Sequence, residues 1–113
     1  MDYKILNIKE DSPTVEQAMA ILEINIAAYK LEGVKVVKVI HGYGSHGTGG
    51  NICNALRNNL FSMKKNKKIK DYLFGNDWDM SNKKCLDILT NLKDCYNDED
   101  LGKSNPGITI IVL

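Results

Sequence analysis

The first forty residues carry a strand, helix, strand pattern, and this order limits the fold more than any other feature of the sequence. Tyr3–Ile8 is short and rich in strand formers, and Val34–Ile40 is dominated by β-branched residues. Between them, Ser12–Glu16 is a helix-start signature, and apolar residues then recur at three- and four-residue intervals up to Gly33. Such a βαβ unit has parallel strands and a right-handed crossover, so we expect the two strands to be neighbours or near neighbours.

The rest of the chain predicts two more helices and two more strands. The patterns are a helix around Ile52–Leu60, a strand at Ile69–Phe74, an amphipathic stretch at Cys85–Tyr96 and a strand at Ile108–Leu113. A chain of 113 residues is the usual size of one domain and can bury a core without disulfides or metals. We therefore expect a single domain spanning residues 1–113.

The composition indicates where the protein is located but does not indicate its function. The formal net charge is +1, so no global field of one sign favours an acidic partner. Three widely spaced cysteines fit neither a disulfide framework nor paired metal ligands, and they favour a reducing, cytoplasmic location. No stretch approaches the roughly 18 apolar residues of a membrane-spanning helix, so we expect no membrane association.

A glycine-rich segment, His41–Gly50, joins the second predicted strand to the second predicted helix. It contains five glycines in ten residues. Backbone amides at such a junction can approach an anion at the positive end of the helix. The spacing lacks the lysine of a phosphate-binding GxxxxGK[ST] loop and is not a convincing dinucleotide fingerprint, so a plain flexible connector remains the alternative. The predicted binding residues here are Gly42, Tyr43, Gly44, Ser45, His46, Gly47, Thr48, Gly49 and Gly50.

This segment, I-H-G-Y-G-S-H-G-T-G-G at Ile40–Gly50, resembles the I-H-G-x-G…T-G loop of the small MutS-related (Smr) domain family. The resemblance continues through Thr14–Ala18, Ala55–Arg57 and Asn105–Leu113, in the family's order. It implies a two-layer α/β sandwich with a four-stranded mixed sheet and two main helices (βαβαββ), plus one inserted helix before the last strand. It also implies nucleic-acid binding or nicking.

The sequence departs from the family where the family's opening L-D-L-H-G motif is expected. Here the chain reads L-N-I-K-E, so Asn7 replaces the acid and Lys9 replaces the histidine. An amide has no basic function at neutral pH, and lysine is protonated there. We therefore expect cleavage to be weak or absent, with Asn7 and Lys9 retained as binding residues.

The remaining candidates are histidine and basic side chains. His41 is the candidate general acid or base, although a lone histidine at a strand end is often only a hydrogen-bonded structural residue. Tyr43 offers a ring on which a base could stack. Arg57 with Lys64, Lys65, Lys67 and Lys68 forms the only basic concentration, which either contacts phosphates or is a solvated helix end. His41 and His46 lack a third ligand nearby, so we expect no metal, and we expect no cofactor.

These observations favour a domain that binds structured DNA or RNA, with the loop amides, His41 and the lysines holding phosphates. The first alternative is a nicking endonuclease that uses His41 as acid or base. The second is a protein-interaction module in which Cys85–Tyr96 presents an apolar stripe to a partner. A third is binding of a small phosphorylated metabolite in the glycine loop. The sequence does not fix the oligomeric state.

Overall fold

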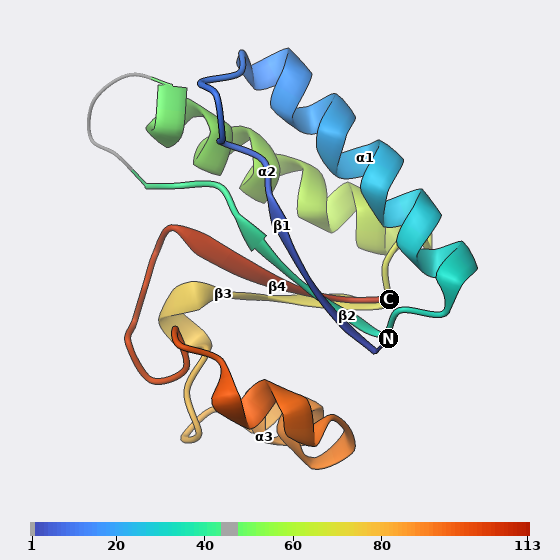
Figure 1. Cartoon of the computed structure of the whole chain (residues 1–113), viewed down its shortest axis with the longest axis vertical. Helices are drawn as coiled ribbons and strands as arrows, with labels where there is room; N and C mark the ends of the chain where they lie inside the picture. The colour runs from blue at the N-terminus through green and yellow to red at the C-terminus, as the bar shows by residue number, and fades with distance from the viewer. Residues whose placement is uncertain (1, 44–47) are drawn as a thin grey trace.

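A computed structural model describes residues 2–43 and 48–113 of the chain, and its centre is a four-stranded mixed sheet in the order β1-β2-β4-β3 (Figure 1). The strands are β1 (Tyr3–Asn7), β2 (Val36–Ile40), β3 (Asp71–Phe74) and β4 (Ile108–Val112). β1 pairs with β2 in parallel, and β4 runs antiparallel to both β2 and β3. The predicted parallel neighbours are thus confirmed, as is the α/β class.

Helix α1 (Val15–Glu32) connects the two parallel strands. Its N-cap is Thr14, which lies within the predicted helix-start signature Ser12–Glu16. The Thr14 hydroxyl accepts a hydrogen bond from the Gln17 amide, and the Gln17 side chain accepts one from the Thr14 amide. The helix ends at Gly33, whose φ of 82° is left-handed, as the glycine there predicts.

Helix α2 (Thr48–Lys65) lies beside α1 on the same face of the sheet, and both helices begin at the end of the sheet where β1 and β2 finish (Figure 1). Together they cover the larger core. Its fully buried side chains include Ile8, Ala18, Leu22, Val37, Val39, Ile52, Leu56, Leu60 and Ile111. In the described part of the chain, no helix is long and apolar enough to cross a membrane.

The opposite face of the sheet is covered by the inserted segment, which contains the short helix η1 (Gly75–Asp77), α3 (Lys83–Asn91) and the short helix η2 (Lys93–Asn97) (Figure 1). A second core lies between this segment and the sheet, formed by Val36, Leu73, Trp78, Cys85, Leu89, Leu92, Cys95, Ile108 and Ile110. The inserted helix therefore adds a layer to the expected sandwich. Cys85, Leu89 and Leu92 of its apolar stripe pack on the sheet, whereas Leu86 and Tyr96 stay exposed.

Candidate nucleic-acid interface

The carboxyl ends of β1, β2 and β3 meet at one edge of the sheet, and the glycine-rich segment leaves from that edge. Asn7 pairs with Ile40 in the parallel register, and the turn before β4 closes over the end of β2. There the carbonyl of Gly107 accepts hydrogen bonds from the amides of His41 and Gly42, both at 3.0 Å. Gly42 has a φ of 75°, a conformation in which glycine is favoured. The start of the segment is therefore held in place by the turn before β4.

Of the predicted loop residues, Gly44, Ser45, His46 and Gly47 lie outside the described residues. Tyr43, which precedes them, is 58% exposed. α2 already begins at Thr48, so Thr48, Gly49 and Gly50 belong to its first turn and not to the connecting loop as predicted. The amides of a first helical turn have no partners within the helix, which keeps the proposed anion contact chemically available.

The side chain of His41 is fully buried and points into the protein. Its Nδ1 lies 2.8 Å from the carbonyl of Gly42 and its Nε2 lies 2.9 Å from the hydroxyl of Thr109. A carbonyl only accepts, so we assign the proton to Nδ1, and Nε2 then accepts from Thr109. Burial lowers the pKa of His41, and the positive charges of Arg57 and Lys9 lower it further, against the opposing hydrogen bonds of the Gly42 and Ile108 backbones.

His41 is therefore a neutral ring whose two nitrogens are both occupied. In this position it cannot reach a phosphodiester, and its geometry is that of a structural link between the end of β2 and β4. Acid–base catalysis by His41 stays a prediction that requires the ring to leave its present contacts.

Asn7 and Lys9 form the turn that follows β1. The Asn7 side-chain oxygen accepts hydrogen bonds from the amides of Lys9 at 2.9 Å and Glu10 at 3.0 Å. The amide of Ile8 bonds to the carbonyl of Ile40 at 2.9 Å, which fixes this turn beside the start of the glycine-rich segment. Asn7 thus shapes the turn, while the exposed Lys9 places a positive charge near His41.

Arg57 lies on α2 with its guanidinium 4.4 Å from the centre of the Phe74 ring, at the carboxyl end of β3. Its Nε and Nη2 are buried and have no hydrogen-bond partner among the residues that the structure describes. Because unpaired buried donors on a cation are costly, these two nitrogens need an acceptor beyond the residues that the structure describes. Arg57 also acts on the pKa of His41, so it stands at the same end of the sheet as Lys9.

Lys64 and Lys65 do not join this group. α2 has 18 residues, so it is roughly 27 Å long, and these lysines stand at its far end. Lys64 makes an ion pair with Asp71 at 3.1 Å, and the neighbouring Lys68 pairs with Glu23 at 3.5 Å. The structure therefore places the predicted binding residues in two separate regions, one at each end of α2.

Comparisons with known proteins bear on the family and the fold of the chain. The Smr domain family model matches residues 12–78, more than half of the chain. The chain belongs to the Smr domain family. The match begins after Asn7 and Lys9, where the sequence departs from the family motif.

A search of solved structures finds a match for this Smr domain in the crystal structure of the Smr domain of Thermus thermophilus MutS2. The TM-score is 0.56 at 14% sequence identity, and the match covers 100% of this chain and 98% of the other. At this identity the likeness establishes the fold alone. A search of curated proteins found no match.

Sequence reasoning missed a buried charge cluster on the inserted-segment face of this Smr domain. Lys38, in the middle of β2, is fully buried, and its Nζ lies 2.7 Å from carboxylate oxygens of both Asp98 and Asp100. The Tyr3 hydroxyl and the Trp78 indole also donate to Asp98, at 2.6 and 3.0 Å. Burial alone would lower the pKa of Lys38, but the hydrogen bonds to Asp100 and Asp98 outweigh it and raise the pKa.

This cluster is connected to the start of the glycine-rich segment. The Asn105 side chain donates to Asp100 at 2.9 Å and accepts from the Gly107 amide at 2.8 Å. The Gly107 carbonyl in turn holds the amides of His41 and Gly42. The only advance signals in the sequence were a lysine inside an apolar strand and the D-x-D-L-G stretch at Asp98–Gly102.

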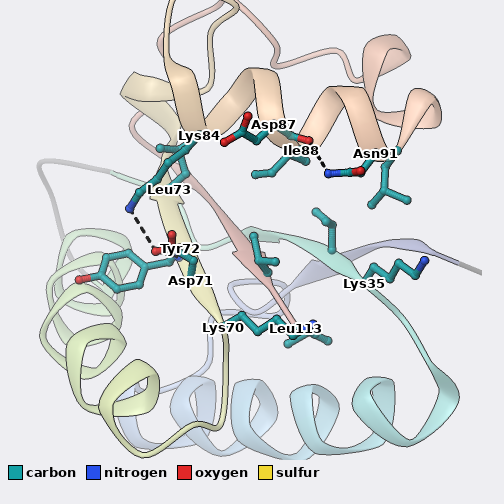
Figure 2. A pocket seen from close by; sticks show the side chains of 13 residues that line it. Lys35, Lys70, Asp71, Tyr72, Leu73, Lys84, Asp87, Ile88, Asn91 and Leu113 are labelled. Atoms are coloured by element: carbon teal, nitrogen blue, oxygen red, sulfur yellow. Dashed lines mark hydrogen bonds and ion pairs between the residues drawn. The ribbon is translucent and has the colours of Figure 1, made fainter.

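A cavity of about 490 Å³ lies between α3 and the opposite end of the sheet (Figure 2). Lys35, Lys70 and Lys84 lie around it, and Lys84 pairs with Asp71 at 3.1 Å. None of the predicted site residues lines this cavity. We therefore assign it no part in the candidate interface.

Proposed function

We propose that this Smr domain binds nucleic acid at the end of the sheet where the glycine-rich segment begins. One observation carries the proposal. Lys9 and Arg57 stand at that end beside His41, and neither makes an ion pair with a carboxylate within the part of the chain that the structure describes. Cations without internal partners are available to phosphates, which are the dominant source of affinity for nucleic acids.

Two neighbouring features support the same ligand. The amides of the first turn of α2, at Thr48–Gly50, have no partners within the helix, and such helix starts favour phosphate. The exposed ring of Tyr43 stands just before the undescribed residues, and stacking on an aromatic ring contributes roughly 1–3 kcal/mol per base. Membership of the Smr family, which we associate with nucleic-acid binding or nicking, agrees with this ligand class.

The lysines at the C-terminal end of α2 have a different role in the proposed binding. Lys64, Lys65, Lys67, Lys68 and Lys70 are all exposed, and some of them already pair with Asp71 or Glu23. At roughly 27 Å from the start of α2, they cannot touch the phosphate that the glycine-rich segment holds. We propose that Lys64 and Lys65 attract the nucleic-acid backbone without sequence preference.

Cleavage is not part of the proposal. The buried His41 has no free ring nitrogen, Asn7 uses its amide oxygen to close a turn, and Lys9 is a cation rather than a base. In the present geometry, none of these three side chains is placed to activate a water molecule. The proposed activity is therefore binding, with cleavage weak or absent.

Fluorescence anisotropy with an RNA hairpin and a DNA duplex tests the binding. Affinity should fall steeply as salt rises from about 50 to about 200 mM, and removing one phosphate-contacting cation should reduce the slope of log affinity against log salt by about 1. The Lys9→Ala and Arg57→Ala variants should each show that reduction. Lys93→Ala, an exposed lysine on η2, serves as the matched control and should bind as the original protein does.

Absence of binding at low salt would refute the proposal. Equal binding by the Lys9→Ala, Arg57→Ala and Lys93→Ala variants would refute the assigned site. For the second half of the proposal, plasmid and RNA are incubated with protein free of contaminating nuclease. Cutting that disappears in His41→Gln would show catalysis by this chain and contradict the non-cleaving assignment.

A further inference from the structure

Helix α1 is apolar on two opposite faces, and the protein covers only one of them. Ala18, Leu22 and Ile26 face the sheet and are buried. On the opposite side, Ile24 is 69% exposed and Leu31 is 92% exposed. A surface helix normally carries polar residues on its outer face, and a helix that is apolar all round is normally buried all round. The outer face of α1 therefore has the composition of a contact surface.

The exposed apolar residues form a regular seam. Ala20, Ile24, Ala27 and Leu31 follow one another at intervals of four, three and four residues, and all four are exposed. This is the spacing with which one helix packs along another in a coiled coil. The exposed Ala28 borders the seam on one side, together with Ile21, which is half-buried and also packs against the larger core.

The seam is complementary to itself. When two copies of α1 lie antiparallel about a two-fold axis, Ala20 faces Leu31 of the second copy and Ile24 faces Ala27 of the second copy. Each contact then joins one large and one small side chain, the alternation that lets two facing surfaces interdigitate. A parallel pair would instead set Leu31 against Leu31 and Ala20 against Ala20.

The charges beside the seam agree with the same arrangement. Glu23 and Lys30 lie on one flank, seven residues apart. In the antiparallel pair this flank meets itself, so Glu23 faces Lys30 of the second copy, and the contact occurs twice. The present partner of Glu23 is Lys68, at 3.5 Å in an exposed pair that contributes little to stability. On the other flank, Ile21 faces Ala28 of the second copy.

We propose that two copies of this chain associate through the outer faces of α1 in an antiparallel, two-fold symmetric pair. The small seam predicts a weak, concentration-dependent dimer. Because α1 and α2 begin at the same end of the protein, the pair places the two candidate nucleic-acid interfaces at opposite ends of the dimer (Figure 1). The dimer does not depend on the proposed nucleic-acid binding.

Sedimentation velocity on the full chain tests the proposal. The mass should rise from 12.7 kDa toward twice that value as the protein concentration rises from micromolar to millimolar. Ile24→Glu should weaken association at least tenfold. Met80→Glu, at an apolar side chain that is 52% exposed between η1 and α3, is the matched control and should leave association unchanged. Circular dichroism checks that both variants keep the fold.

A charge exchange tests the antiparallel geometry. Glu23→Lys places like charges opposite each other in the homodimer, and so does Lys30→Glu. Each variant alone should therefore associate several-fold more weakly than the original protein. A mixture of the two should restore association as a heterodimer, because every facing pair is then of opposite charge.

Three outcomes would overturn the proposal. The first is a chain that stays monomeric at millimolar concentration, which would also mean that any partner of this face is a different molecule. The second is a dimer that Ile24→Glu leaves intact. The third is a mixture of the charge variants that associates no better than either variant alone.

Discussion

Lys38 and His41 lie three residues apart, and both side chains are completely buried. Lys38 is nevertheless charged, whereas His41 is neutral. Lys38 keeps its charge, because Asp98 and Asp100 each place an oxygen 2.7 Å from its Nζ. His41 has only a carbonyl and a hydroxyl beside its ring nitrogens, and burial lowers its pKa so that the neutral form is favoured.

The two regions differ in whether their positive charges have carboxylate partners within the chain. On the inserted-segment face the positive charge is compensated by carboxylates of the same chain, so that region is complete in itself. At the start of the glycine-rich segment, Lys9 and Arg57 bring positive charge without a carboxylate partner among the described residues. We propose that a phosphate of the nucleic acid supplies the missing negative charge there.

The largest expected effect comes from breaking the compensated pair. Lys38→Met leaves Asp98 and Asp100 buried without their cation, which should lower the free energy of unfolding by about 3–5 kcal/mol. Lys35→Met, at an exposed lysine just before β2, is the control and should change it by less than about 0.5 kcal/mol. Urea unfolding at neutral pH measures both, and a loss below about 1 kcal/mol for Lys38→Met would contradict the account.

A smaller effect tests the hydrogen bonds around the cluster. Tyr3→Phe removes only the hydroxyl that donates to Asp98 at 2.6 Å, and a hydrogen bond to a charged group contributes about 1.5–3 kcal/mol. Since Tyr3 is only half-buried, we expect a loss near the lower limit, measured by urea unfolding. Tyr29→Phe, also half-buried on α1, should lose much less, and equal losses would show that the Asp98 contact adds nothing.

The smallest stability effect concerns the pH response of His41. Its pKa is lowered from 6.5 in the folded protein, so below about pH 6.5 the unfolded chain takes up a proton that the folded protein does not. The free energy of unfolding should therefore be fully maintained above that pH and fall as the pH drops toward the lower folded pKa.

His41→Gln should remove this part of the pH dependence, because a glutamine amide can donate to the Gly42 carbonyl and accept from Thr109 without titrating. The measurement is urea unfolding between neutral pH and about pH 5, above the range in which the lowered pKa of Asp100 matters. An unchanged slope in His41→Gln would contradict the buried, neutral assignment.

Much of this fold could be predicted because periodicity and end signals are local. The strands, α1 with its Gly33 ending, and the helical spacing of Ile52–Leu60 needed only nearby residues. The start of α2 at Thr48 was missed because a glycine-rich stretch does not indicate a helical turn. The stripe at Cys85–Tyr96 was correctly identified as apolar, but periodicity does not say whether such a stripe covers a sheet or a partner.

The candidate site was harder to predict because its geometry depends on distant contacts. Lys38 interrupts an apolar strand, and its partner Asp100 lies 62 residues later. His41 is turned inward by Thr109, which is 68 residues away. Lys64 and Lys65 were predicted to bind because they belong to the basic concentration that includes Arg57, but the sequence does not show that the length of α2 separates them from the glycine-rich segment.

The most direct test of the central claim is an NMR titration of the ¹⁵N-labelled chain with a short RNA or DNA hairpin at low salt. The account predicts that the largest amide shifts occur at Lys9, Gly42 and Tyr43 and in the first turn of α2, with smaller shifts near Lys64 and Lys65. Shifts confined to the lysine end of α2 or to the cavity beside α3, with the start of the glycine-rich segment unchanged, would contradict it.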